Sequence, residues 1–337
     1  MTTPLVGGAS PEGHGPPVAD GASDAMAAAA PEGASDAPAS DDGLRLRVEA
    51  ALAAWPSDGS PADRALIDEA AAVVAALLAA LELGTLRAAE PDAAAAGGWR
   101  VNAWVKSGIL LGFRLPGLRT FRDGEILAAR DRAAFGVLDV IDGAGARIAA
   151  SAGAPWRVVP GGTTARSGVH LEPGVTIMPP AYLNVGAWVG RGTMVDSHAL
   201  VGSCAQIGAR VHLSAAAQVG GVLEPAGARP VVVEDDAFIG GGCGLYEGVV
   251  VGHGAVLGAG VILTGQGRLV DLTLGRELRG TPDAPLVVPP GAVVVPGSRP
   301  APGYYAEELG IALSVPVIVK FRDESTNART ALEEALR

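Results

Sequence analysis

The chain has 337 residues, of which 49% are hydrophobic, 4% aromatic and 18% charged, with 48 glycines and 25 prolines. Scarce aromatic side chains beside abundant glycine, alanine and valine predict thin layers joined by many turns. No stretch approaches the roughly 18 uninterrupted apolar residues of a membrane-spanning helix, and the N-terminus lacks the basic-then-apolar order of a signal peptide. The sequence therefore predicts a cytoplasmic protein that does not act at a membrane.

The formal net charge is −11, and most of it lies near the N-terminus. Residues 1–42 contain seven acidic residues and no lysine or arginine. A segment of alanine, proline, glycine, serine and aspartate cannot bury enough apolar surface to offset the entropy lost on ordering. Residues 1–42 are therefore predicted to be a disordered acidic tail. The rest of the chain has no basic stripe, which argues against a nucleic-acid partner.

Helical periodicity begins at about residue 43 and predicts a small N-terminal domain over residues 43–125. Leu44, Val48 and Leu52 recur at a spacing of four, and a longer run over 62–83 does the same and ends at Gly84. The apolar segment 98–115 is interpreted as a strand or a helix that packs this domain together. Residues 126–156 are predicted to connect it to the next domain.

An internal repeat of six residues begins near residue 157. Every sixth residue from Leu171 to Val219 is aliphatic, and the same phase resumes at Val233 and continues to Leu263. The step of fourteen between Val219 and Val233 indicates a loop of eight extra residues, around residues 223–230. The aliphatic positions between these ends are Ile177, Leu183, Val189, Val195, Val201, Ile207, Leu213, Ile239, Leu245, Val251 and Leu257.

A period of six fits neither the helix nor the alternating strand. It fits a coil with three short flat sides, in which one aliphatic side chain per side points to the axis and eighteen residues make one coil. Fifteen such units predict about five coils over residues 157–300, with residues 289–297 as a closing piece. Each coil can bury its edge only against the next coil.

Hexapeptide repeats of this kind resemble the left-handed parallel β-helix of acyltransferases, whose hand departs from the usual crossover rule. The fold class is thus predicted to be mainly β, with a small α-helical N-terminal domain and a short strand and helix over residues 301–337. The resemblance implies trimers with sites in the grooves between neighbouring prisms. Acetyltransferases, succinyltransferases and zinc-dependent γ-class carbonic anhydrases share this shape, so residue chemistry must choose among them.

A zinc site of the γ-class carbonic anhydrase kind is the first alternative to acyl transfer. No two histidines of the repeat have the spacing of about five residues that would bring two rings to one ion, so no metal site is predicted. The two cysteines, Cys204 and Cys243, are too few for a disulfide framework. The histidines of the repeat are His170, His198, His212 and His253.

Acyl transfer from a thioester to an amine needs a group that removes a proton from the ammonium ion. Asp196 follows the inward residue Val195 at a corner position, so its carboxylate is expected at the prism surface. His198, two residues later, is a further candidate base. An aspartate that caps a turn is the structural alternative for Asp196.

Four segments of the repeat closely resemble one family of enzymes. These are RVVPGG at 157–162, PPAYLNVGAWV at 179–189, the stretch from GTMVDSHALVG to GGVLEP at 192–225, and VVVEDDAFIG at 231–240. Residues 99–115 and 315–337 also resemble its N-terminal domain and its C-terminal strand and helix. Over residues 45–337 the chain resembles the 2,3,4,5-tetrahydropyridine-2,6-dicarboxylate N-succinyltransferases.

The resemblance implies a homotrimeric enzyme of lysine and diaminopimelate biosynthesis. Its members transfer succinyl from succinyl-CoA to the amine of L-2-amino-6-oxopimelate, which forms when the cyclic imine hydrates and opens. Two substrate-binding positions carry over, Arg157 in the RVVP motif and Asp196 in the MVD motif. Arg157 offers a planar fork to a carboxylate, and Asp196 can hold the ammonium and take its proton.

One departure concerns a second acidic residue. Many members carry a glutamate where this chain has Gly244, in the segment GGGCGLYEG. Glu247 survives three residues later and is the second catalytic candidate. The alternatives are that Asp196 alone covers the role, or that positioning does most of the work.

The donor, succinyl-CoA, is expected to lie in a groove between subunits, where its pantetheine amides meet backbone groups. Arg268 is a candidate for a substrate carboxylate, and no metal is required by this chemistry. Two alternatives remain: an acetyl-CoA-dependent or otherwise diverged N-acyltransferase of a related amino-dicarboxylate, and a non-catalytic β-helix protein. The groove candidates are Ser214, Ala215, Gly220, Gly221 and Gly241.

Overall fold

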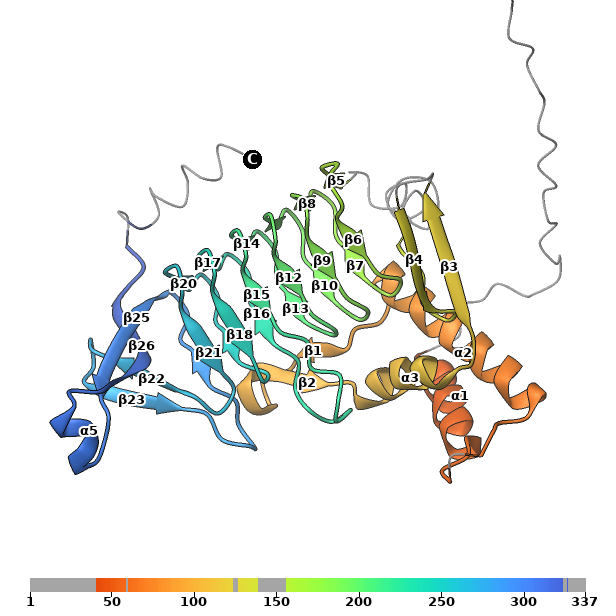
Figure 1. The fold of residues 1–337 in the computed structure, drawn as a ribbon, viewed down its shortest axis with the longest axis horizontal. Coiled ribbons are helices and arrows are strands. Elements are labelled where there is room, and N and C mark those ends of the chain that lie inside the picture. The colour runs from red at the N-terminus through yellow and green to blue at the C-terminus, as the bar shows by residue number, and fades with distance from the viewer. Residues whose placement is uncertain (1–40, 59, 124–126, 139–155, 324–325, 327–337) are drawn as a thin grey trace, which may run out of the picture. The chain divides into compact units, whose positions relative to one another are not determined.

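The computed structural model describes residues 41–58, 60–123, 127–138, 156–323 and 326 (Figure 1). The predicted acidic tail, up to residue 40, lies outside the described residues, as do residues 139–155 of the predicted connecting segment and nearly all of the predicted C-terminal helix. None of the described helices is long and apolar enough to cross a membrane.

Three helices make up most of the N-terminal domain: α1 (Asp41–Ala54), α2 (Arg64–Leu83) and α3 (Ala103–Arg114). The N-terminus of α2 is capped by Asp63, whose carboxylate accepts a hydrogen bond from the Leu66 amide at 2.8 Å. Its C-terminus ends at Gly84, which takes the left-handed conformation with φ 73°. The apolar faces of the three helices meet in a buried cluster that includes Val74, Leu77 and Ile109.

Short hairpins complete this domain. Strands β1 (Ala89–Pro91) and β2 (Trp99–Val101) pair antiparallel, with a 3₁₀ turn, η1 (Ala96–Gly98), before β2. Strands β3 (Leu118–Asp123) and β4 (Leu127–Arg132) form a second hairpin. The segment 98–115, whose structure the sequence left open, is thus divided between β2 and α3.

The repeat folds into a parallel β-helix with three faces, each built from one two- or three-residue strand per coil (Figure 1). Face 1 consists of β5 (Arg157–Val158), β8 (Thr176–Ile177), β11 (Met194–Val195), β14 (His212–Leu213), β17 (Phe238–Ile239), β20 (Val256–Leu257) and the start of β25 (Ala292–Pro300). Face 2 consists of β6 (Thr164–Ala165), β9 (Tyr182–Leu183), β12 (Leu200–Val201), β15 (Gln218–Val219), β18 (Gly244–Tyr246) and β21 (Ile262–Thr264). Face 3 consists of β7 (His170–Leu171), β10 (Trp188–Val189), β13 (Gln206–Ile207), β16 (Val232–Val233), β19 (Val250–Val251) and β24 (Val287–Val288).

Three edges join these faces. Edge A joins face 1 to face 2 and includes residues 196–199, 214–217, 240–243 and 258–261. Edge B joins face 2 to face 3 and includes residues 202–205, 220–231, 247–249 and 265–286. Edge C joins face 3 to face 1 and includes residues 190–193, 208–211, 234–237 and 252–255.

The strand register confirms the period of eighteen residues per coil, because Trp188 pairs with Gln206 in the next coil. Gln206 pairs in turn with Val232, which places the eight-residue insertion on edge B, as the phase shift predicted. The phase of the repeat did not predict a second insertion. Val250 pairs with Val287, so nineteen extra residues also leave the coil at edge B. They include the hairpin of β22 (Arg268–Asp271) and β23 (Arg276–Arg279). Strands β24 and β25 then close the coil in the region predicted for the closing piece.

Aliphatic side chains of the hexad fill the axis of the coil. Leu171, Ile207 and Leu245 are fully buried, as are their counterparts in the other coils. Glycine often follows the inward residue because successive coils touch there: a Cβ on Gly202 would lie 2.1 Å from the Gly221 nitrogen. The thin cross-section leaves little room for rings, which accounts for the low aromatic content.

The N-terminal domain covers face 3. The guanidinium of Arg87 lies 3.9 Å from the ring centre of Trp188, and its Nε donates to Gln206 Oε1 at 3.0 Å. The indole of Trp99 donates to Glu234 Oε1 at 3.2 Å. His170 binds the carbonyl of Glu82, at the end of α2, through Nδ1 at 2.8 Å. These contacts fix the helices against the first coils.

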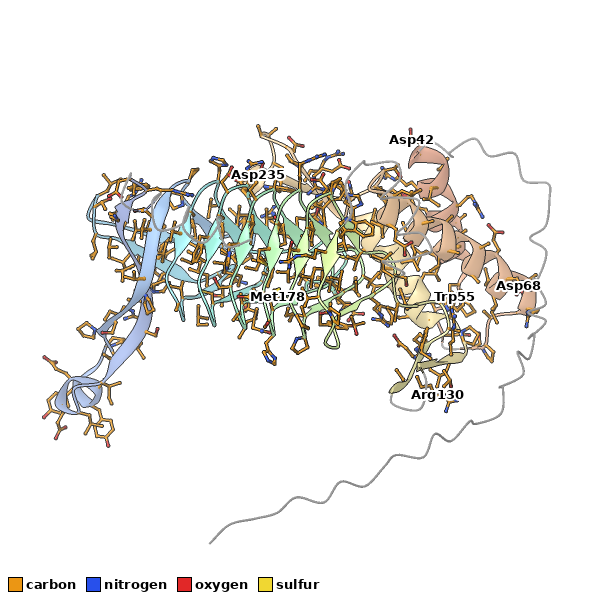
Figure 2. The ribbon with its side chains drawn as sticks, turned by 90° about the horizontal axis from the view of Figure 1, so that it is seen from above. Asp42, Trp55, Asp68, Arg130, Met178 and Asp235 are labelled. Carbon is orange, nitrogen blue, oxygen red and sulfur yellow. The ribbon has the colours of Figure 1, made fainter. Side chains whose placement is uncertain are left out.

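The opposite end of the coil carries an arm. Strand β25 continues past face 1 and pairs antiparallel with β26 (Ala312–Phe321), which contains the predicted C-terminal strand. Figure 2 shows this hairpin running away from the coil with α5 (Tyr304–Glu308) at its tip. Tyr304 and Tyr305 on α5 are 82% and 72% exposed, so the tip has little contact with the rest of the described chain.

We predict that His170 makes the protein less stable in mild acid. Burial lowers the pKa of His170 below its ordinary value of 6.5. The unfolded chain therefore binds more protons than the folded chain as the pH falls below about 6.5, and the free energy of unfolding falls with it, by at most about 1.4 kcal/mol per pH unit. Urea unfolding between pH 7.5 and 5 should show a smaller loss for His170→Gln than for the parent chain. His253→Gln, at an imidazole that is 63% exposed, is the control, and an unchanged slope for His170→Gln would contradict the assignment.

Candidate functional site

Arg157 and Asp196 lie on the same side of the coil. Arg157 begins β5 on face 1, and Asp196 follows β11 on the same face, two strands farther along. Strand spacing and rise put their Cα atoms roughly 12 Å apart. The side chain of Arg157 is exposed and has no hydrogen bond or ion pair to the described residues. The pair thus offers a free cation and a carboxylate to one molecule that spans them.

Asp196 opens edge A, as the hexad phase predicted. Its amide nitrogen donates to the carbonyl of Leu213 in the next coil at 2.9 Å, which holds the residue in the ladder. One carboxylate oxygen, Oδ1, accepts from the Ser197 amide at 2.7 Å. The side chain is partly exposed. Asp196 therefore caps the turn and still presents carboxylate to solvent, so the turn-capping role does not exclude the chemical one.

Edge A also carries three of the predicted groove residues. Ser214 and Ala215 occupy the corner one coil beyond Asp196, and Gly241 occupies the corner after that. A Cβ on Gly241 would lie 3.3 Å from the Ala215 carbonyl oxygen, so these corners stack closely. His198 is exposed on the same edge and takes the left-handed conformation with φ 63°.

The remaining candidates lie on edge B. Gly220 and Gly221 precede the first insertion, and Glu247 follows β18 with an exposed side chain and φ 56°. Face 2 separates this edge from Asp196. One chain therefore does not bring Asp196 and Glu247 together.

Gly244, the position without the expected glutamate, lies beneath the ring of Tyr246. A Cβ on Gly244 would be 2.6 Å from Tyr246 Cε2, and one on Gly220 would be 2.7 Å from Tyr246 Cδ1. The aromatic ring thus occupies the space in which a side chain at position 244 would begin.

Arg268 lies on β22, within the second insertion. Its Nη1 is 3.3 Å from Glu277 Oε2 on β23, so the guanidinium already has a carboxylate partner across the hairpin. It would have to leave this partner to bind a substrate.

The first insertion is held by Lys106 of α3, whose part the sequence did not indicate. Lys106 is fully buried, and its Nζ donates to the carbonyl oxygens of Pro225, at 3.3 Å, and Ala228. Burial lowers the pKa of Lys106. The available signal was a single cation inside an otherwise apolar helical run, because such a residue needs buried acceptors.

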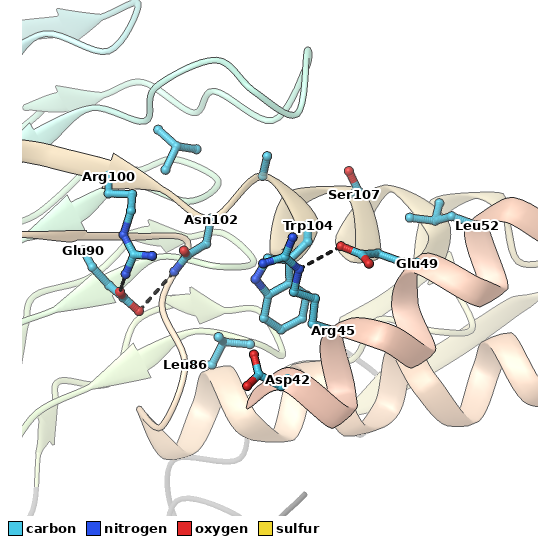
Figure 3. A pocket seen from close by; sticks show the side chains of 12 residues that line it. Asp42, Arg45, Glu49, Leu52, Leu86, Glu90, Arg100, Asn102, Trp104 and Ser107 are labelled. Atoms are coloured by element: carbon cyan, nitrogen blue, oxygen red, sulfur yellow. Dashed lines mark hydrogen bonds and ion pairs between the residues drawn. The ribbon is translucent and has the colours of Figure 1, made fainter. Parts of the chain in front are cut away.

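A hollow in the N-terminal domain lies apart from the site residues that the sequence predicts. It has a volume of about 540 Å³ and lies between α1 and the start of α3 (Figure 3). Its cations are already paired: Arg45 contacts Glu49 at 2.8 Å, and Arg100 contacts Glu90 at 2.6 Å. None of the predicted site residues lines it. Among the described residues, no group of three or more His, Cys, Asp or Glu side chains is placed to hold a metal ion.

Comparison with known sequences identifies the family. Residues 51–115 match a family described as tetrahydrodipicolinate N-succinyltransferase N-terminal, and residues 230–265 match the hexapeptide repeat of succinyl-transferase. A 2,3,4,5-tetrahydropyridine-2,6-dicarboxylate N-succinyltransferase of Methylobacterium sp. (strain 4-46) is 42% identical over 85% of this chain and 96% of its own length. The protein of the same name from Ruegeria pomeroyi is 43% identical over 86% of this chain and 98% of its own. The chain belongs to this family.

Membership confirms the resemblance found in the sequence, and the coil is the left-handed parallel β-helix that the hexads predicted. The family match covers both the helical domain and the coil, which the hexad pattern alone would not distinguish from other acyltransferases.

We predict that Lys106 stabilises the protein through the first insertion. Lys106→Met keeps the apolar stem but removes the donor to two loop carbonyls, so the free energy of unfolding should fall by about 1–3 kcal/mol. Urea unfolding measures this loss. Lys320→Met is the matched control, because Lys320 pairs with Asp323 at the surface and its removal should change stability by less than about 0.5 kcal/mol. Equal free energies of unfolding for Lys106→Met and Lys320→Met would contradict this role of Lys106.

Proposed function

We propose that the protein transfers the succinyl group of succinyl-CoA to the amine of L-2-amino-6-oxopimelate, the ring-opened form of tetrahydrodipicolinate. Family membership supports the reaction, and the placement of Arg157 and Asp196 on one face is the observation that carries it. The proposal places the enzyme in lysine and diaminopimelate biosynthesis, in the cytoplasm.

Arg157 binds a carboxylate of the acceptor through its planar guanidinium. Asp196 holds the acceptor ammonium and takes one of its protons, which leaves an amine with a free electron pair. The nitrogen attacks the thioester carbonyl carbon, the C–S bond breaks, and CoA leaves as the thiolate, which takes the second proton that the nitrogen loses. The products are the N-succinyl compound and CoA. Asp196 suits the role because Ser197 fixes one of its oxygens while the carboxylate stays accessible.

The complete site is proposed to lie between subunits of a homotrimer. Face 2 separates Asp196 on edge A from Glu247 on edge B within a chain, but edges of neighbouring prisms can face each other. Glu247 would then act as a second proton carrier beside the amine or the leaving thiolate. The exposed tyrosines on the arm are a surface available for contacts between chains.

The donor is proposed to follow the groove between subunits. Ser214, Ala215 and Gly241 would line it from edge A, and the exposed Gly221 from edge B, with backbone groups meeting the pantetheine amides. Gly220 is buried under the Tyr246 ring and would act through the shape of the strand. Arg268 is the weakest of the proposed contacts because Glu277 already holds it. The comparisons do not favour the diverged acyltransferase or the non-catalytic β-helix protein.

The first test is release of CoA thiol. With succinyl-CoA, release should depend on tetrahydrodipicolinate and saturate in both substrates. Acetyl-CoA in parallel should give a much lower kcat/KM, and a thiol reagent measures both rates. A higher rate with acetyl-CoA would move the protein to the alternative donor. No release of CoA thiol with either donor would contradict the proposed reaction.

Asp196→Asn should lower kcat by about 10²–10⁴-fold, because the amide keeps the corner but cannot accept the proton. Asp235→Asn is a matched control, since Asp235 (labelled in Figure 2) also accepts a backbone N–H, that of Ala209 at 2.8 Å, but lies on edge C. Its kcat should match that of the parent chain. A full rate for Asp196→Asn would overturn the role of this carboxylate.

The same variant tests whether two chains form the site. If Asp196 and Glu247 come from different subunits, Asp196→Asn and Glu247→Gln chains should each have low activity alone. Mixed trimers, refolded or co-expressed, would contain some interfaces with both native residues and should regain part of the activity. No gain on mixing would place the two carboxylates in separate sites.

A further inference from the structure

The two insertions of the coil meet in a pocket on edge B. The pocket has a volume of about 270 Å³. The first insertion contributes Val222, Ala228 and Arg229, and the segment after β21 contributes Gly265 and Gln266. Glu247, after β18, and three residues near the end of the second insertion complete the lining; those three are Thr281, Pro282 and Pro285.

The pocket has two charged residues, Glu247 and Arg229, and the described chain gives no partner to Arg229. Its Nε is buried and makes no hydrogen bond, and no ion pair or other side-chain contact joins its guanidinium to the described residues. Glu247 lines the same pocket without forming an ion pair with it. Burial lowers the pKa of Arg229, and no neighbouring carboxylate opposes this effect.

The other arginines of the described chain differ from Arg229. Those shielded from solvent have partners: Arg87 has Gln206, Arg166 has Asp131, and Arg268 has Glu277. Those without a partner, among them Arg157 and Arg191, are exposed and can be hydrated. Among the arginine side chains that the structure describes, Arg229 alone is both shielded and unpaired.

Arg229 is half-buried, and its buried Nε is unfavourable without an acceptor, because burial removes water that no protein group replaces. Guanidinium pairs best with the two oxygens of a carboxylate. Apart from Arg229, Glu247, Gln266 and Thr281, small and apolar residues line the pocket, which has room for a short chain, and both insertions that form it interrupt an otherwise regular coil. The described residues do not pair with Arg229, and a small anion from outside the chain would supply the partner that it lacks.

We propose that Arg229 binds a carboxylate of one of the two substrates in the pocket between the insertions. This inference rests on the proposed function, in which the succinyl donor ends in a carboxylate and the acceptor carries two. A carboxylate held there would fix the substrate chain at edge B of one subunit, while Arg157 on face 1 and Asp196 on edge A of a neighbouring subunit act at the amine. If the succinyl donor supplies that carboxylate, Arg229 is also a specificity residue, because an acetyl group has no carboxylate to offer it.

Arg229→Gln tests the proposal through KM. The variant should raise KM for the substrate that supplies the carboxylate by about 10- to 100-fold. Arg229→Lys should recover part of this loss, because it restores charge without the fork. Arg191→Gln, which removes an exposed and unpaired arginine on edge C, should leave both KM values unchanged.

Separate titrations of succinyl-CoA and of the acceptor distinguish the two possible sources of the carboxylate. A rise confined to KM for succinyl-CoA, with inhibition by free CoA unchanged, assigns the donor carboxylate to Arg229. A rise confined to KM for the acceptor assigns an acceptor carboxylate. Both KM values within twofold of the parent would overturn the proposal. So would an equal loss of affinity for succinyl-CoA and free CoA, because the anion would then be a phosphate of the nucleotide.

Thermal unfolding supplies a readout that does not depend on catalysis. Removing an unpaired shielded charge should leave the Tm of Arg229→Gln and Arg229→Met equal to, or above, that of the parent chain. A Tm lower by several degrees would show a structural role and overturn the proposal. Parent chain that releases no thiol would end the proposed function, whereas an active parent with unaffected KM values in Arg229→Gln would end this inference alone.

Discussion

The structure depends on one packing constraint: the coil has a core only one aliphatic side chain deep per face, and each coil can cover its neighbour only if their backbones approach closely. The inward residues of the hexad are fully buried throughout the coil, and glycine follows many of them because a Cβ would strike the next coil. This arrangement leaves no interior volume for a ligand. Chemistry is therefore confined to the edges and faces, where every corner repeats at a fixed spacing.

A regular repeat places similar residues at every corner of an edge. The candidate functional residues and the two insertions are the places where the chain departs from this regularity. Asp196 occupies a corner position that often holds glycine, and it both caps the turn and presents a carboxylate. The two insertions leave the coil at the same edge, B, and only there do they enclose a pocket lined by both. The proposed chemistry of edge A and the proposed specificity of edge B belong to different sides of one chain, which is the physical reason for expecting a site shared between chains.

Buried polar groups attach the helical domain to the coil. Arg87 and Lys106 of the helical domain lose water on folding and donate to acceptors on the coil. His170 of the coil binds the carbonyl of Glu82 in the helical domain. Such contacts are specific because a shift of one residue would leave a buried donor without an acceptor. Lys106 also sets the position of the first insertion, so the fold of the N-terminal domain influences the shape of edge B. Arg229 stands apart from this group because the described chain gives it no acceptor.

The sequence by itself determined the repeat, the eighteen-residue coil, the first insertion and the family, because a six-residue aliphatic period has one simple structural solution and the motifs around Arg157 and Asp196 are specific. It also placed Asp196 at a corner, since the phase of the repeat fixes which residues point outward. The sequence does not reveal the second insertion, because the stretch after it is too short to show the phase of the six-residue repeat. Only the tertiary structure decided which candidates share an edge, that Lys106 reaches carbonyls more than a hundred residues away, and that Tyr246 fills the space above Gly244. Those facts depend on distances between segments remote in the chain, and local pattern carries no information about such distances.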